Sequence, residues 1–102
     1  MQDIIRKNLE EIRNICASLN VKKLYVFGSA SKGSFRPDSD IDLLVSFNEN
    51  LSFEDYADNY FELHYRLRDL LHREIDIVTE RSLHNPYFIQ NVNKTKKLIY
   101  EA

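Results

Sequence analysis

The sequence has little of several residue types that mark particular protein classes. Its 102 residues include one cysteine, two glycines, two prolines and no tryptophan. The lone Cys16 excludes an internal disulfide, and its place among apolar residues at helical spacing indicates that it packs in the core. So few glycines and prolines exclude a linker or a disordered tail. No apolar stretch approaches the ~20 residues that cross a bilayer, and the charged start lacks the apolar core of a signal peptide. We therefore expect a cytoplasmic protein that does not contact membranes.

Charge and length limit the expected partners and the number of domains. The chain carries 14 lysines and arginines against 16 aspartates and glutamates, which gives a formal net charge of -2. Non-specific binding to nucleic acid depends on neutralising many phosphates, so we expect no direct nucleic-acid partner. A chain of this length predicts a single domain over residues 1–102 with a modest core of its own.

The period of the hydrophobic pattern changes along the chain in an orderly way. An amphipathic pattern after Asp3 predicts one continuous helix of about 16 residues that stops at Asn20. A longer one predicts a helix with Ser52 as its N-cap and an apolar face that includes Phe53 and Phe61. The remaining expected elements are strands over 22–27, 40–47 and 74–79, a helical turn at 29–32, a helix opened by Asn85-Pro86, and a short strand at 98–100. This order predicts an α/β (α+β) domain with a small sheet flanked by helices.

Two acids interrupt what otherwise reads as a buried strand at 40–47. Asp40 and Asp42 point to one face of this strand, because side chains two residues apart share a face. The apolar residues Ile41, Leu43 and Val45 point to the other face. A buried carboxylate costs several kcal/mol unless something positive neutralises it, so the acids indicate a functional site.

Asp76 has the same setting in the third strand, between Ile75 and Ile77. If the two strands are neighbours, three carboxylates converge, and two unit charges ~4 Å apart repel by roughly 4 kcal/mol at an effective dielectric of about 20. Oxygen ligands with an open coordination shell suit Mg²⁺, with Mn²⁺ as an alternative, and two such ions can clamp a phosphoryl displacement. The structural alternative is that the acids cap the backbone or pair with nearby arginines.

The connection after the first strand supplies a candidate anion cradle. Gly28 lets the backbone approach a polyphosphate closely, and Ser29 offers a hydroxyl and an N–H group. Lys32 and Arg36 lie on the same connection and could contact phosphate oxygens or remain solvated loop charges.

These residues carry a family resemblance. Residues 27–33 and 36–45 together resemble the signature of the polymerase-beta-type nucleotidyltransferase superfamily, and Asp76 stands where that superfamily places its third carboxylate. The compact size and the tail at 85–101 resemble, more narrowly, the minimal nucleotidyltransferases, which are antitoxins of bacterial and archaeal toxin–antitoxin pairs. At Lys32 the superfamily usually has arginine; lysine keeps the charge but loses bidentate phosphate geometry.

The resemblance implies a mixed sheet and a mechanism. Asp40 and Asp42 would bind two metal ions, one of which carries the triphosphate of ATP. Asp76 would complete the second metal site and help to deprotonate or orient the acceptor hydroxyl. Gly28 and Ser29 would hold the β and γ phosphates, so that attack at the α phosphorus transfers AMP and releases pyrophosphate.

The chain is too short to contain a separate domain that recognises an acceptor, so the acceptor is expected on a partner. In the minimal family the partner is typically a helical ribonuclease toxin with a HEPN domain, and the resemblance implies transfer of AMP to one of its tyrosines. Tyr56, Tyr60, Tyr87 and Phe88 could supply contact surface, but the favoured interpretation is that most of them face the sheet.

Two functional classes stay open. The first is an enzyme that transfers AMP and thereby silences a toxin, and the second is a module of the same fold that blocks the toxin by contact alone. The joint presence of Gly28, Ser29, Asp40, Asp42 and Asp76 favours the enzyme. Transfer to a small molecule or an RNA end is disfavoured because no acceptor domain is present.

The remaining polar residues are interpreted as structural. No two of the three histidines have the spacing of metal ligands, so zinc is not expected, and His64 takes a core-facing helical position. Lys94, Lys96 and Lys97 read as a solvated helix end. Asp38 suits a turn in the loop before the second strand.

Overall fold

The computed structural model describes residues 3–28 and 40–102 of the chain. Its elements in chain order are α1 (Asp3–Lys7), α2 (Leu9–Ser18), β1 (Val21–Phe27), β2 (Ile41–Phe47), α4 (Phe53–Leu71), β3 (Ile75–Thr79), the 3-10 helix η1 (Glu80–Ser82), α5 (Pro86–Thr95) and β4 (Lys97–Glu101). The strands form one sheet in the order β3-β2-β1-β4, in which β2 and β3 are parallel and the other pairs antiparallel. The expected α+β fold with a mixed sheet is confirmed. The turn expected at 29–32 lies outside the described residues.

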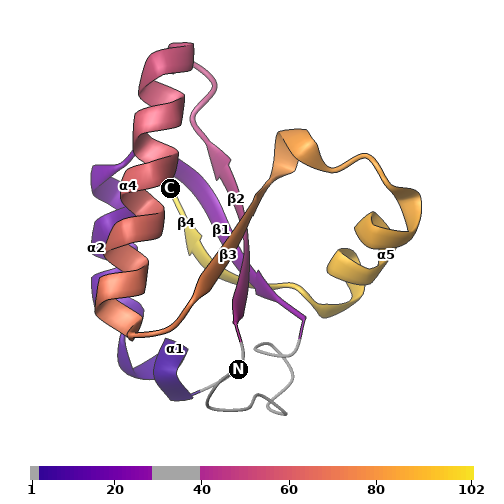
Figure 1. Cartoon of the computed structure of the whole chain (residues 1–102), viewed down its shortest axis with the longest axis horizontal. Helices are drawn as coiled ribbons and strands as arrows, with labels where there is room; N and C mark the ends of the chain where they lie inside the picture. Colours follow the sequence, from indigo (N-terminus) through magenta and orange to yellow (C-terminus); the bar gives the residue numbers. More distant parts are fainter. Residues whose placement is uncertain (1–2, 29–39) are drawn as a thin grey trace.

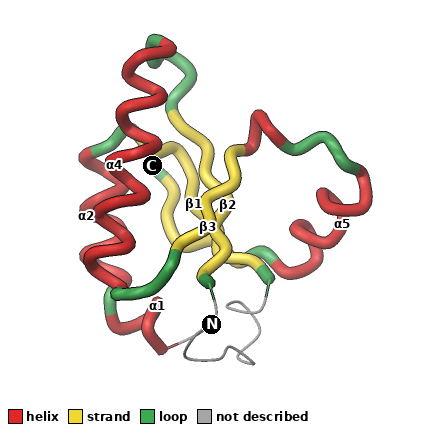
Figure 2. The backbone as a smooth tube through the Cα atoms, viewed as in Figure 1, coloured by secondary structure: helices red, strands yellow, loops and turns green. Residues whose placement is uncertain are grey.

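The helices lie on opposite sides of the sheet. α2 and α4 run side by side along one face, whereas α5 stands apart on the other side (Figures 1 and 2). The larger core fills the space between α2, α4 and the sheet. Its fully buried side chains include Ile5, Ile12, Leu24, Ile41, Leu43, Val45, Leu63, Leu67 and Ile99. A smaller cluster of Phe27, Leu44 and Val92 lies under α5. One face is therefore sealed by two helices, and the other keeps space for a site.

The first helix is not continuous as expected, because Asn8 breaks it. The side-chain amide of Asn8 donates to the carbonyl of Ile4 at 2.8 Å, and its backbone N–H turns to the carbonyl of Ile5 at 3.3 Å. Asparagine competes for backbone partners in this way, which disfavours it inside helices. The apolar residues still reach the core on both sides of the break, and Cys16 is buried as predicted. Burial raises the pKa of its thiol to about 12.

α4 begins at its predicted N-cap. The side chain of Ser52 accepts a hydrogen bond from the N–H of Asp55 at 3.1 Å, and His72 ends the helix in the left-handed conformation. The buried residues of the helix are Leu63, Leu67 and Leu71. Phe53 and Phe61 were expected on the apolar face, and this was wrong, since they are 84% and 57% exposed. Apolar residues surround more than half of this helix, so their spacing alone does not identify the buried seam.

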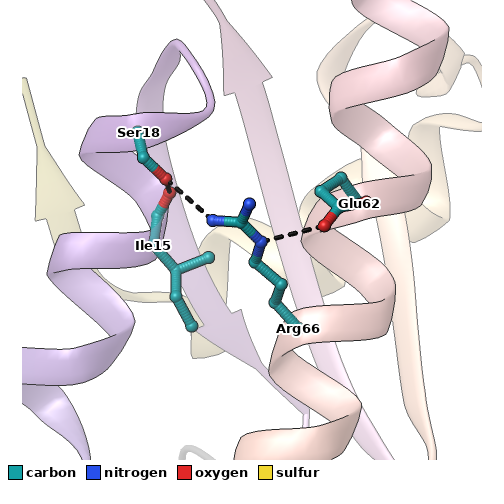
Figure 3. A network of polar contacts seen from close by, with 4 residues as sticks. All are labelled: Ile15, Ser18, Glu62 and Arg66. Carbon is teal, nitrogen blue, oxygen red and sulfur yellow. Dashed lines mark hydrogen bonds and ion pairs between the residues drawn. The ribbon is translucent and has the colours of Figure 1, made fainter.

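An exposed polar network joins the two helices of the sealed face (Figure 3). Arg66 on α4 donates to Glu62 at 3.0 Å and to the hydroxyl of Ser18 on α2 at 3.2 Å. Ser18 in turn donates to the carbonyl of Ile15 at 2.8 Å. Exposed ion pairs contribute little stability, about 0–1 kcal/mol, so this network sets the orientation of two surfaces that the core already holds together.

The last helix follows its sequence signals closely. The side chain of Asn85 accepts hydrogen bonds from the N–H groups of Tyr87 and Phe88, and Pro86 takes the first helical position. The two aromatic residues at the start of α5 differ in their packing. The ring of Phe88 packs edge-on against Phe27, whereas the side chain of Tyr87 is 83% exposed. Among the helices that the structure describes, none is long and apolar enough to span a membrane.

The buried seam of α4 predicts which of its residues carry stability. Leu63→Ala leaves a cavity at a fully buried position, so we expect it to lower the free energy of unfolding by about 2–5 kcal/mol. Phe61→Ala, two residues away on the exposed side, is the matched control and should change it by no more than about 0.5 kcal/mol. Urea unfolding followed by circular dichroism measures both. Equal losses for the two variants would show that the seam is assigned to the wrong face.

Candidate active site

Three strands bring the predicted site residues into one row at the same end of the sheet. Phe27, the last residue of β1, lies opposite Asp42 in the antiparallel pair, and Asp42 lies opposite Asp76 in the parallel pair. Gly28 follows Phe27 directly. Since neighbouring strands are about 4.8 Å apart, this register places Gly28, Asp42 and Asp76 side by side. The condition under which the acids of the two strands converge, that the strands are neighbours, is met.

Gly28 is placed where a side chain would meet the Asp42 carboxylate. Its φ angle is +68°, in the left-handed region that favours glycine. A Cβ atom built on it would lie 2.9 Å from Oδ2 of Asp42, closer than real Cβ atoms approach. Both the conformation and the contact therefore require glycine. The consequence is a bare backbone turn directly against one carboxylate of the site.

The electrostatics of Asp42 agree with this crowding. Burial raises the pKa of its carboxyl, and the negative charges of Asp76 and then Asp40 raise it further. Asp40 is exposed and lies just before β2, two residues from Asp42. Within the described part of the chain, no arginine or lysine forms an ion pair with any of these three acids. The structural alternative of arginine pairing is thus not realised among these residues.

A cation would suit this arrangement, although the described side chains do not enclose one by themselves. Among residues 3–28 and 40–102, no group of three or more histidine, cysteine or acidic side chains could hold a metal ion. Asp42 and Asp76 instead form a directly opposed pair, with Asp40 further out. Mg²⁺ commonly binds through one or two carboxylates together with substrate phosphates, so a pair of this kind fits the ion when a nucleotide is present.

The other predicted binding residues fall on the connection between β1 and β2. Ser29, Lys32, Arg36 and Asp38 lie outside the described residues, so their expected roles stay predictions.

Thr95, at the end of α5, supports the site, and no local sequence pattern indicated this. Its hydroxyl accepts a hydrogen bond from the N–H of Gly28 at 3.1 Å and donates to the carbonyl of Asn91 at 3.1 Å. Thr95 is 9% exposed, which makes it the one buried polar residue in the described chain. Its partner is 67 positions away in sequence, so only the fold reveals the contact. A lone threonine near a helix end is otherwise an unremarkable residue in sequence.

Comparison with known proteins agrees with this geometry. The model of the family described as polymerase beta nucleotidyltransferase matches residues 10–102. This chain belongs to that family. The resemblance drawn from residues 27–33, 36–45 and Asp76 is thereby confirmed at the level of the family.

Individual relatives match nearly the whole chain. A protein of Methanocaldococcus jannaschii, provisionally named a protein adenylyltransferase, is 32% identical over 100 residues, which is 98% of this chain and 93% of that protein. A solved structure provisionally described as a minimal nucleotidyltransferase has a TM-score of 0.73 and 35% identity, and the match covers 94% of this chain and 95% of that one. A chain from a toxin–antitoxin crystal structure with AMP-PNP has a TM-score of 0.71 and 26% identity, covering 93% of this chain and 74% of that one.

The contact between Gly28 and Asp42 can be tested by a double-mutant cycle. Gly28→Ala should lower the free energy of unfolding by about 1–3 kcal/mol, because alanine is strained in the left-handed region and its methyl group meets the carboxylate. In an Asp42→Ala background only the backbone strain remains, so the loss should fall toward about 1 kcal/mol. Urea unfolding of the four proteins gives both values. An equal loss in the two backgrounds would contradict the contact.

The raised pKa of Asp42 predicts that this residue lowers the stability of the ligand-free protein. The unfolded chain releases the Asp42 proton near its ordinary pKa of 3.8, at lower pH than the folded chain. Stability should therefore fall as pH rises from 3.8 through the folded pKa, and the loss should persist at neutral pH. We expect Asp42→Asn to raise the free energy of unfolding at pH 7 by about 0.2–1 kcal/mol, the range for directly opposed like charges in a sheet.

The pH series contains the check on this reading. The gain from Asp42→Asn should shrink as pH falls through the folded pKa toward 3.8 and vanish below 3.8, where the carboxyl is protonated in both states. Asp58→Asn, at an exposed position on α4, is the control and should show no such pH-dependent gain in thermal unfolding. A wild-type protein more stable than Asp42→Asn at pH 7 would contradict the inferred crowding.

Proposed function

We propose that this chain is a protein adenylyltransferase that moves AMP from ATP to a hydroxyl of a partner toxin and so acts as an antitoxin. The observation that carries the proposal is the row of Gly28, Asp42 and Asp76 across three strands. A bare turn beside two opposed carboxylates provides both halves of a phosphoryl-transfer site. The family membership supports the same reaction class.

The proposed reaction balances without an oxidant or reductant. The acceptor hydroxyl oxygen forms a bond to the α phosphorus of ATP, and the bond from that phosphorus to the oxygen bridging to the β phosphate breaks. Pyrophosphate leaves with the bonding electron pair, and the hydroxyl proton passes to the carboxylate of Asp76. The backbone at Gly28 lies close enough to Asp42 to hold the triphosphate against the carboxylate pair, and positioning of this kind supplies much of the rate in phosphoryl transfer.

A divalent ion, Mg²⁺ or Mn²⁺, is the proposed cofactor. Asp40 and Asp42 would hold the ion that carries the triphosphate, and Asp76 would complete a second ion site. The ions would neutralise the phosphate oxygens and the crowded carboxylates. The raised pKa of Asp42 supports this assignment, because a nearby cation would favour the charged carboxylate. Among the described residues Asp42 has no ion-pair partner, and the bound ion would supply a partner of opposite charge.

The proposed partner is a toxin with a HEPN domain, and the proposed acceptor is a tyrosine hydroxyl. A relative from Thermococcus cleftensis, 35% identical over 83 residues, is named protein adenylyltransferase MntA. The similar chain with 26% identity comes from a structure described as a toxin–antitoxin with AMP-PNP. These names support an antitoxin role for the present chain.

A second function remains as the alternative, in which the same fold neutralises the toxin by contact without transfer. The exposed Phe53, Phe61 and Tyr87 favour it to the extent that they offer contact surface outside the acidic site. The two functions differ in one respect that can be measured, because only the enzyme depends on Asp42.

A transfer assay separates the two functions. The protein is incubated with ATP labelled at the α phosphate, Mg²⁺ and the candidate partner, the product of the adjacent gene. We expect label on the partner, lost on chelation of the metal and reduced at least about a hundredfold by Asp42→Asn, because a metal-held phosphate is worth several kcal/mol in the transition state. Asp58→Asn is the matched control and should transfer at the wild-type rate. Mass spectrometry of the partner identifies the modified residue.

The contrary outcome is equally clear. If the wild-type protein leaves no label on the partner while both it and Asp42→Asn silence the toxin, transfer is wrong and neutralisation by contact is correct.

A further inference from the structure

Asp76 lies on β3, an edge strand of the sheet. Side chains of α4 cover the edge of β3 that faces away from β2. Among the strands that the structure describes, β3 has a neighbour only on the β2 side. The N–H of Ile41 donates to the carbonyl of Glu74 at 3.0 Å, so Glu74 and, by alternation, Asp76 direct their backbone groups toward β2. The carbonyls of Ile75 and Ile77 consequently face outward, away from the sheet.

Two side chains of α4 bind these outward carbonyls. The hydroxyl of Tyr60 donates to the carbonyl of Ile77 at 2.9 Å, and Nε2 of His64 lies 3.0 Å from the carbonyl of Ile75. A carbonyl only accepts hydrogen bonds, so Nε2 of His64 carries the proton. Burial and then the charge of Asp76 raise the pKa of Tyr60, which keeps its hydroxyl protonated as a donor.

The spacing of the two donors matches the spacing of the two acceptors. Tyr60 and His64 are four residues apart on a helix, a rise of about 6 Å. Ile75 and Ile77 are two residues apart on a strand, a rise of about 6.6 Å. The helix therefore bonds two successive outward carbonyls of the strand, and Asp76 is the residue between them.

We propose that Tyr60 and His64 are positioning residues for Asp76, because they hold the free edge of β3 in register on both sides of this acid. This inference rests on the proposed function, since the role of Asp76 is to accept or orient the proton of the acceptor hydroxyl. Edge strands are the strands of a sheet that lack one set of partners. A carboxylate on such a strand needs support from outside the sheet to keep a fixed distance from Asp42.

We call the two hydrogen bonds from Tyr60 and His64 to β3 the clamp. The clamp predicts a kinetic effect that a general loss of stability would not produce. Tyr60→Phe and His64→Leu each remove one donor, and each should lower kcat for AMP transfer about tenfold, with a larger loss in the double variant. The KM for ATP should stay within about twofold, because the nucleotide is held at Gly28 and Asp42 on the inner strands. His64→Gln, whose side-chain amide can still donate to the carbonyl of Ile75, should recover most of the His64→Leu loss.

Tyr65→Phe is the matched control. Tyr65 is 58% exposed on the same helix, so loss of its hydroxyl should leave kcat unchanged. Thermal unfolding of every variant shows whether it is folded at the assay temperature, and Tyr60→Phe alone decides the matter if the double variant is not. A rise in the KM for ATP equal to the fall in kcat, or no difference between Tyr60→Phe and Tyr65→Phe, would overturn the proposal.

A second readout does not depend on transfer. Hydrogen exchange of the β3 amides, measured by mass spectrometry on the protein without nucleotide, should be faster in Tyr60→Phe and His64→Leu than in wild type or Tyr65→Phe. If wild type transfers no AMP but the exchange result holds, the proposed function fails and the clamp stands. If wild type transfers AMP and the exchange of β3 is unchanged in both variants, the clamp fails alone.

Discussion

The opposition of Asp42 and Asp76 across a parallel strand pair is the constraint on which the rest of this structure depends. Two carboxylates about 5 Å apart repel by roughly 3 kcal/mol at an effective dielectric of about 20, less where water screens them. Parallel strands require a long crossover, and α4 supplies it between β2 and β3. The same helix buries Leu63, Leu67 and Leu71 against the sheet. One connection thus creates the repulsive pair and provides apolar contacts that hold the two strands together despite it.

Much of the fold and the core of the site could be predicted from local patterns. The alternation around Asp42 and Asp76 identifies acids on an otherwise apolar strand, and Ser52, Asn85 and Pro86 mark helix starts by well-understood capping chemistry. These signals involve residues that are close in sequence, so they can be recognised without a structure. The strand order could not be predicted in this way. From the sequence, the convergence of the acids depended on the two acidic strands being neighbours, and only the pairing of β2 with β3 in the structure established that.

What could not be predicted depends on contacts between distant residues or on competition within one segment. Thr95 meets Gly28 only once the chain after α5 has returned to pair β4 with β1. The buried seam of α4 was ambiguous because apolar residues lie on most of its circumference. The helix breaks at Asn8 because the side chain of this residue donates a hydrogen bond to a backbone carbonyl of the same helix. The spacing of the hydrophobic residues is intact on both sides of the break, so the hydrophobic pattern does not reveal it.

The two faces of the sheet divide the work of stability and chemistry. The α2 and α4 side is apolar and closed, whereas the other side carries the acids and is covered only in part by α5, through Phe27, Phe88 and the Thr95 hydrogen bond. On the closed side, a nucleotide could not reach the acid pair. Without the apolar packing of α2 and α4 against the sheet, little would offset the repulsion between the two acids. Ligands that bind only the folded state stabilise it in proportion to their concentration and affinity. A cation that neutralised the pair would therefore offset its cost on binding, so under the proposed function the repulsion would favour ligands that bring positive charge.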